Sequence, residues 1–196
     1  MSRIAAVILA GGRGERLGGV NKALIEIGGQ KLIERAVEAI AGCDPILVAV
    51  GRRPFATAGL RQVIDLPGDY AGPLAGVAAA VEALRSDPPK LLLSLAVDTP
   101  FFPRDFLRRA TSALIGASAV VGAFGAQDYP TNALWRFDAI RTLPTEVRAG
   151  TAQRSLKRLA AALSAARLDY LGVSADDPFA NVNTPEELAI LRGRIA

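Results

Sequence analysis

The chain has 196 residues, with 23 Lys and Arg, 19 Asp and Glu, one cysteine and no histidine. Without an imidazole base it cannot carry a Ser-His-Asp or Cys-His nucleophilic site, and one cysteine cannot complete a tetrahedral zinc site. The single cysteine, Cys43, also excludes an intramolecular disulfide, which agrees with a reducing cytoplasm. Any metal that the chain binds should therefore prefer oxygen ligands, as magnesium does.

The composition is that of a globular protein. Hydrophobic residues make up 51% of the chain and charged residues 21%. The net charge of +4 comes from scattered basic residues and aromatic residues are only 6%, so nothing favours a nucleic-acid-binding face. The sequence shows neither a signal-peptide pattern nor an apolar stretch of membrane-spanning length. We therefore expect a cytoplasmic protein with no nucleic-acid or membrane partner, which acts on small phosphorylated molecules.

Apolar runs of strand length alternate with helical patterns over roughly the first 125 residues. Continuous apolar runs are typical of strands that are covered on both faces, as in a parallel sheet. The runs are Ile4–Leu9, Ile46–Val50, Val63–Ile64, Leu91–Val97 and Ala119–Phe124. Between them, apolar residues recur on one helical face around residues 32–40, 74–84 and 106–114. This alternation predicts an α/β layered sheet with right-handed crossovers.

The last third of the chain has a different pattern. The predicted elements are a short strand at Ala133–Trp135, helices from Phe137 and over Ser155–Leu163, and a late strand at Leu168–Leu171. A final helix should begin at Thr184, because Thr184, Pro185 and Glu187 form an N-cap, a first-turn proline and a capping box. No linker rich in Gly, Ser or Pro separates the two parts, so we predict one domain over residues 1–196.

A glycine-rich segment follows the first predicted strand, from Leu9 to Lys22. Its five glycines let successive backbone N–H groups point into one concavity that binds phosphate oxygens. Arg16 and Lys22 can supply the positive charge that a triphosphate requires. The segment is no dinucleotide fingerprint, since Leu17 stands at the third glycine position, and no Walker loop, since Asn21 precedes the lysine. Its place after the first strand favours a phosphate-binding loop over a plain surface turn.

A carboxylate follows the fourth apolar run, because Asp98 comes directly after Leu91–Val97. Ligands of open parallel sheets bind at the carboxyl ends of strands, near the point where the strand order reverses, so Asp98 and the glycine-rich loop should share one edge. A carboxylate there can hold magnesium against nucleotide phosphates. The alternative is that Asp98 only forms a turn before Pro100, and its pairing with the loop favours the metal.

Five segments, in this order, resemble a known family. They are Leu9–Lys22, Tyr70–Gly76, Asp98–Pro100, Tyr129–Trp135 and Phe179–Leu188. Together they are similar to the molybdenum cofactor guanylyltransferases, the enzymes that make molybdopterin guanine dinucleotide. The first and third segments are shared by many nucleotidyltransferases, whereas the second and fifth narrow the choice.

The resemblance implies a fold and a reaction. The fold would be a three-layer α/β/α sandwich with a Rossmann-like, mostly parallel sheet of the nucleotide-diphospho-sugar transferase type. Its nucleotide-binding half would span about residues 1–125 and its acceptor-binding half about residues 126–196. The reaction would be transfer of GMP from GTP to the terminal phosphate of molybdenum-bound molybdopterin, with release of pyrophosphate and with Mg²⁺ as the cofactor.

The resemblance also implies roles for individual residues. Asp98 matches the family's magnesium-binding aspartate, and Lys22 would bind the phosphates of the nucleotide. We expect Lys22, Arg16 and the loop amides to stabilise the charge on the pyrophosphate leaving group. The remaining positions are the nucleotide contacts Leu9, Ala10, Gly11, Gly12 and Asp65, and, near the acceptor or the metal, Asn181 and Asn183. No general base is needed, because the acceptor phosphate is already ionised near neutral pH.

Three positions depart from the family pattern. Asn21 replaces an aspartate, Val50 stands at a nucleotide-contacting asparagine, and Tyr129 replaces a histidine before Pro130. One open alternative is a related nucleotidyltransferase with another nucleotide or acceptor: cytidylyl transfer to molybdopterin, or transfer to a sugar or alditol phosphate. Another is a non-catalytic nucleotide-binding regulator, which Asn21 and Val50 would favour. The oligomeric state and any contacts with other cofactor-biosynthesis proteins or recipient enzymes stay open.

Overall fold

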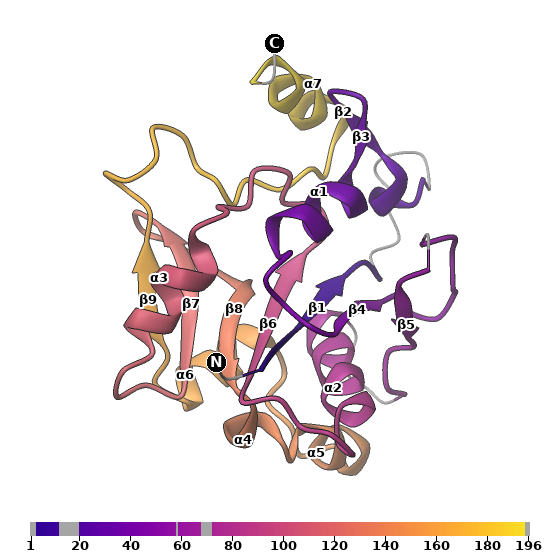
Figure 1. Ribbon diagram of the computed structural model, residues 1–196, viewed down its shortest axis with the longest axis vertical. Coiled ribbons are helices and arrows are strands. Elements are labelled where there is room, and N and C mark those ends of the chain that lie inside the picture. Colours follow the sequence, from indigo (N-terminus) through magenta and orange to yellow (C-terminus); the bar gives the residue numbers. More distant parts are fainter. Residues whose placement is uncertain (1–2, 12–19, 58, 68–71, 195–196) are drawn as a thin grey trace.

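The structure is a computed structural model that describes residues 3–11, 20–57, 59–67 and 72–194. The strands are β1 (Ile4–Leu9), β2 (Glu26–Ile27), β3 (Gln30–Lys31), β4 (Ile46–Ala49), β5 (Arg61–Val63), β6 (Leu91–Ala96), β7 (Ala119–Phe124), β8 (Gln127–Arg136) and β9 (Ala166–Asp169). The helices are the 3₁₀ turn η2 (Lys22–Leu24), α1 (Leu32–Ala39), α2 (Pro73–Ala83), α3 (Phe106–Ala113), α4 (Phe137–Ile140), α5 (Leu143–Ala149), α6 (Leu156–Ala162) and α7 (Pro185–Gly193). Figure 1 shows their arrangement.

Seven strands form the central sheet in the order β5-β4-β1-β6-β8-β7-β9. The strands β1 and β4 each run parallel to both of their neighbours, and β9 runs parallel to β7. The strand β8 runs antiparallel to both β6 and β7. The predicted mostly parallel α/β sheet is therefore confirmed. A separate two-stranded hairpin, β2–β3, lies beside α7 at the top of Figure 1.

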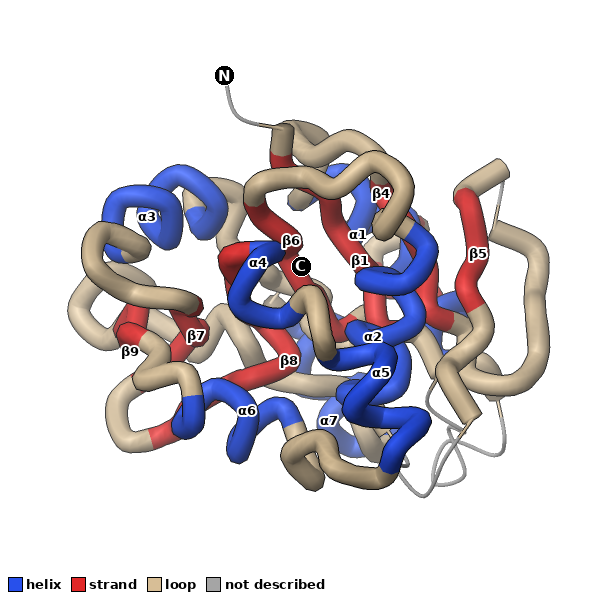
Figure 2. The backbone as a smooth tube through the Cα atoms, turned by 90° about the horizontal axis from the view of Figure 1, so that it is seen from below, coloured by secondary structure: helices blue, strands red, loops and turns tan. Residues whose placement is uncertain are grey.

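The two faces of the sheet bury separate apolar clusters. Ala6 and Ile8 of β1 pack with α1 and α3, whereas Ala5 and Val7 pack with α2, α4, α5 and α6. This alternation follows from the period of two along a strand, and every residue of β6 is buried because helices cover both of its faces. In Figure 2, α3 and α6 lie on opposite sides of the strands. The fold is a three-layer α/β/α sandwich, as predicted.

The predicted short strand at Ala133–Trp135 is wrong in extent. The strand β8 has ten residues, and its first half is polar, so the apolar pattern shows only the buried end. The predicted strands at Val63–Ile64 and Leu168–Leu171 are shifted toward the C-terminus, since Ile64 and Leu171 are exposed and the strands end at Val63 and Asp169. The hairpin β2–β3 and the helix α5 were not predicted.

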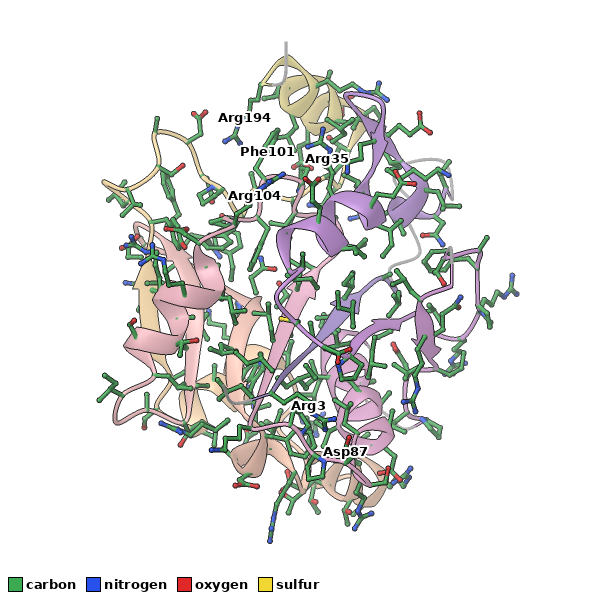
Figure 3. The ribbon with its side chains drawn as sticks, in the orientation of Figure 1. Arg3, Arg35, Asp87, Phe101, Arg104 and Arg194 are labelled. Atoms are coloured by element: carbon green, nitrogen blue, oxygen red, sulfur yellow. The ribbon has the colours of Figure 1, made fainter. Side chains whose placement is uncertain are left out.

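The last helix begins as its sequence predicts. The Thr184 hydroxyl accepts a hydrogen bond from the Glu187 N–H at 3.2 Å, and the Glu187 carboxylate accepts one from the Thr184 N–H at 3.1 Å. At the other end, the Arg194 guanidinium lies 4.3 Å from the centre of the Phe101 ring (Figure 3), in the segment that follows Asp98. The helix α7 is thus attached to the edge of the sheet where strand β6 ends.

Candidate active site

The strand order reverses beside β1. The chain passes from β1 to β4 and β5 on one side, then returns to β6 on the other side, so the ends of β1 and β6 flank a switch point. Leu9 pairs with Ala96, and the Val97 N–H donates to the Leu9 carbonyl at 3.2 Å. Asp98 and the start of the glycine-rich loop therefore share the edge where the sequence placed them.

A cavity of about 290 Å³ opens at this edge. Its lining includes six residues expected in the site, namely Leu9, Gly11, Lys22, Asp65, Asp98 and Asn181. Ala10 is buried next to Gly11, and Asn183 reaches the cavity residues through Lys22. Gly12 and Arg16 lie outside the described residues.

Lys22 joins the two halves of the chain. Its ammonium group donates to the Asp98 carboxylate and to the Asn183 side-chain oxygen, each at 2.7 Å. The side chains of Lys22 and Asp98 are only 14% and 17% exposed, so solvent weakens this ion pair much less than a surface pair. The side-chain oxygens of Asp98 and Asn183, which lie 85 positions apart in the sequence, thus already bind a cation, the Lys22 ammonium group.

Local structure fixes each member of this cluster. Lys22 begins η2, and the Asn21 side-chain oxygen caps this turn by accepting the Ala23 N–H at 3.0 Å. Asparagine and aspartate cap equally well, so the departure at Asn21 keeps the turn that presents Lys22. Asp98 is held because its carbonyl accepts the Val182 N–H at 3.0 Å. That bond places the segment carrying Asn181 and Asn183 over the end of β6.

The Asp65 carboxylate lies between two glycines, Gly11 and Gly76, where neighbouring atoms approach the backbone closely. A Cβ on Gly11 would lie 2.8 Å from the Gly51 nitrogen and 3.3 Å from an Asp65 oxygen, and a Cβ on Gly76 would meet the other Asp65 oxygen at 3.3 Å. A side chain at either position would crowd the carboxylate. Burial raises the pKa of Asp65, against the opposing effect of a backbone hydrogen bond from Gly51. The Asp65 Oδ1 atom is buried with no hydrogen-bond partner among the described residues.

The other two departures are also explained locally. Val50 is buried in the apolar core and its N–H donates to the Val63 carbonyl, so its side chain contributes no polar contact to the site. The Tyr129 hydroxyl donates to the Asp177 carboxylate and its ring packs against Phe179. Burial and this carboxylate raise the Tyr129 pKa, so the phenol stays neutral.

Sequence reasoning missed several residues of the cavity wall. Gly72, Pro73, Gly76 and Thr131 line it as well. The segments Tyr70–Gly76 and Tyr129–Trp135 carried the resemblance, and that was the available signal. No spacing rule shows which of their residues face a ligand.

The donor set suits a hard metal ion that is shared with phosphates. Within the described residues, no group of three or more His, Cys, Asp or Glu could hold a metal ion. Magnesium is usually bound by one or two carboxylates together with substrate phosphates, so one carboxylate with amide oxygens beside it fits. The buried Asn181 side-chain oxygen, which has no partner among the described residues, is a further oxygen of the right kind.

A switch-point cavity lined by Gly11, a lysine and a carboxylate is typical of α/β enzymes that bind nucleotides. A sequence family described as the MobA-like NTP transferase domain matches residues 6–168. The molybdenum cofactor guanylyltransferase of Rhodobacter capsulatus is 35% identical over 195 residues, which cover 98% of this chain and 97% of that protein. The protein of the same name from Rhodopseudomonas palustris (strain HaA2) is 34% identical over 199 residues, which cover 96% of this chain and 90% of that protein.

Solved structures have the same fold. The molybdopterin-guanine dinucleotide biosynthesis protein A of Archaeoglobus fulgidus matches with a TM-score of 0.72 at 22% identity, over 98% of both chains. The 2-C-methyl-D-erythritol 4-phosphate cytidylyltransferase of Thermus thermophilus matches with a TM-score of 0.71 at 22% identity, also over 98% of both chains. At this identity these two likenesses show the fold alone.

The chain belongs to the molybdenum cofactor guanylyltransferase family, within the MobA-like nucleotidyltransferases. The predicted family, the predicted class of enzyme and guanylyl transfer in molybdopterin guanine dinucleotide synthesis are thereby confirmed. Among the described residues, no helix has the length and apolar character needed to span a membrane.

Proposed function

We propose that this chain acts in the cytoplasm and transfers GMP from GTP to the terminal phosphate of molybdenum-bound molybdopterin, with Mg²⁺ held at Asp98. The observation that carries the site assignment is the contact of Lys22 with both Asp98 and Asn183 beside the cavity. It gathers a phosphate-binding cation, a carboxylate and an acceptor-side amide within one hydrogen-bonded cluster.

The nucleotide would enter along the end of β1. The backbone of Leu9, Ala10, Gly11 and Gly12 would approach the nucleotide closely. The close approach of Gly11 to Gly51 supports this, because it requires a residue without a side chain next to the cavity. The Asp65 Oδ1 atom, which has no hydrogen-bond partner in the part of the chain that the structure describes, needs a donor, and guanine N–H groups or ribose hydroxyls would supply one.

Asp98 would hold the metal ion, with Asn183 and Asn181 as the nearby amide oxygens. Bound magnesium would neutralise charge on the donor phosphates. Lys22 has to exchange its carboxylate partner for phosphate oxygens when the nucleotide binds, and its position between Asp98 and Asn183 leaves it within reach of both halves of the site.

Phosphoryl-type transfer asks the protein mainly for positioning and for charge stabilisation. Lys22, Arg16 and the amides of the glycine-rich loop would stabilise the pyrophosphate leaving group. Asn181 and Asn183 would orient the acceptor, whose phosphate attacks without a general base. This is why a chain without histidine can perform the reaction.

Two local observations argue against a non-catalytic regulator. Asn21 still caps η2, and Val50 faces the core, so neither departure alters the carboxylate or the lysine of the cluster. The similarity to a cytidylyltransferase lies in the fold alone and does not favour transfer of another base.

A nucleotide panel tests the proposal. Thermal unfolding is measured with GTP, CTP, ATP or UTP and Mg²⁺, followed by pyrophosphate release with molybdenum-bound molybdopterin. GTP at about a hundred times its dissociation constant should add about 2.7 kcal/mol, or about 5–10 °C for a chain of this size. Stronger stabilisation and faster turnover with CTP would overturn the choice of base, and no pyrophosphate release with any nucleotide would overturn the reaction.

A further inference from the structure

The strand β8 leaves its ladder close to the candidate site. Its pairing with β6 ends at Ser94 and Ala133. Its pairing with β7 jumps from Val121–Ala133 to Gly122–Tyr129, so Pro130, Thr131 and Asn132 form a bulge with no partner on β7. Bulges of this kind redirect side chains near active sites. Here Thr131 lines the cavity that Asp98 also lines.

The Asn132 side chain takes over where the ladder stops. It is fully buried, and its Oδ1 atom accepts the Ala96 N–H at 2.9 Å. The Thr99 hydroxyl lies 3.5 Å from the same oxygen and donates to the Ala96 carbonyl at 2.8 Å. The two contacts involve Ala96, which is two residues before Asp98, and Thr99, which is one residue after it. An amide oxygen thus replaces the backbone carbonyl that a regular strand would present to β6.

This arrangement leaves the Asn132 side-chain nitrogen without a partner in the described part of the chain. Only an oxygen can accept the Ala96 N–H, so the Asn132 Nδ2 atom must point away, and it is buried without a partner among the described residues. An unpaired buried donor lowers stability. Such groups are rare in folded proteins and concentrate where function demands them.

We propose that Asn132 is a positioning residue, which fixes the turn from Ala96 to Thr99 and thereby holds Asp98 in place for metal and nucleotide phosphates. The inference rests on the proposed function of Asp98. Three backbone bonds also support the turn: the Val97 N–H donates to the Leu9 carbonyl, the Val182 N–H to the Asp98 carbonyl and the Thr99 N–H to the Ala96 carbonyl. Asn132 is the side chain that links this turn to the bulge carrying Thr131.

The test compares Asn132→Ala and Asn132→Leu with Ser94→Ala. Ser94 is as fully buried as Asn132 and lies on β6, two residues before Ala96 and so further from Asp98. Its hydroxyl accepts a hydrogen bond from the Trp135 indole N–H at 2.9 Å. Asn132→Leu removes the unpaired donor along with the oxygen and fills the space, so its loss of thermal stability should not exceed that of Asn132→Ala. All three variants keep Asp98 itself.

Mn²⁺ binding is measured by electron paramagnetic resonance in the presence of GTP, together with the separate kinetic constants kcat and KM for the acceptor. Both Asn132 variants should bind Mn²⁺ at least about tenfold more weakly and lose at least about tenfold in kcat with little change in KM. Ser94→Ala should stay within about twofold for each, whatever its melting temperature. Equal effects in Ser94→Ala and the Asn132 variants would overturn the positioning role. A wild-type chain that binds no Mn²⁺ with GTP would instead overturn the metal site and the inference together.

Discussion

Replacing Lys22 with methionine is expected to tighten the binding of free Mn²⁺ and to weaken the binding of GTP. In the ligand-free structure the Lys22 ammonium group lies 2.7 Å from the Asp98 carboxylate. A metal ion that approaches Asp98 without a nucleotide has to compete with this cation. Methionine keeps most of the aliphatic stem and removes the charge.

The size of the effect follows from Coulomb's law. At 2.7 Å, two unit charges attract by about 1.5 kcal/mol at the dielectric constant of water and by about 6 kcal/mol at an effective value of about 20. Both side chains are less than a fifth exposed, so their attraction is stronger than the lower of these two energies. Free Mn²⁺ should therefore bind at least about tenfold more tightly. GTP should bind about 10- to 100-fold more weakly, because one charge-assisted hydrogen bond to phosphate is lost.

Mn²⁺ titrations by electron paramagnetic resonance without nucleotide, and GTP titrations by calorimetry, measure the two affinities. Lys90→Met is the matched control, since Lys90 is exposed at the start of β6 on the opposite edge of the sheet. It should change neither affinity by more than about twofold. Unchanged or weaker Mn²⁺ binding in Lys22→Met would refute the competition, and unchanged GTP binding would remove Lys22 from the phosphate site.

Asp98→Asn should lower turnover at least about a hundredfold, as measured by pyrophosphate release, while unfolding stays cooperative; a variant with more than half of the wild-type rate would remove Asp98 from the metal site. Asp65 has a raised folded pKa, so the ligand-free chain loses stability as pH rises from the unfolded value of 3.8 through the folded value. Asp65→Asn should therefore stabilise the ligand-free chain at pH 7 but not at pH 3, and it should weaken GTP binding. Denaturant unfolding without nucleotide at the two pH values measures the change in stability. Equal stability changes at pH 7 and pH 3 would contradict this prediction. Gly76→Ala should lower stability by about 1–3 kcal/mol in denaturant unfolding, because the new Cβ would lie 2.9 Å from the Ala49 Cβ and 3.0 Å from a Leu9 methyl group; wild-type stability would show that these contacts relax freely.

The buried parallel strands were the easiest part of the fold to predict. The strands β1 and β6 are covered on both faces, so their residues form unbroken apolar runs, and the capping residues mark the start of α7 directly. The strand β8 was shortened in the prediction because its polar half borders the cavity and contains the bulge. A two-residue strand pair such as β2–β3 is too short for periodicity to show.

The site was predictable where chain order and topology coincide. Asp98 and the glycine-rich loop each follow a strand, and parallel topology brings such ends together. The contact between Lys22 and Asn183 spans 161 positions, and no local pattern encodes it. The resemblance placed Asn183 near the acceptor or the metal, and the structure shows how it is reached, through the Val182 bond to Asp98. Asn132 was missed because its role depends on where β8 leaves the ladder.

The most direct test of the account is a single-turnover assay with GTP that carries ³²P at the α-phosphate, molybdenum-bound molybdopterin and Mg²⁺. Label should appear in molybdopterin guanine dinucleotide in an amount equal to the pyrophosphate released, and Asp98→Asn should abolish both. Labelled product from CTP in preference to GTP, or label transfer by Asp98→Asn at the wild-type rate, would contradict it.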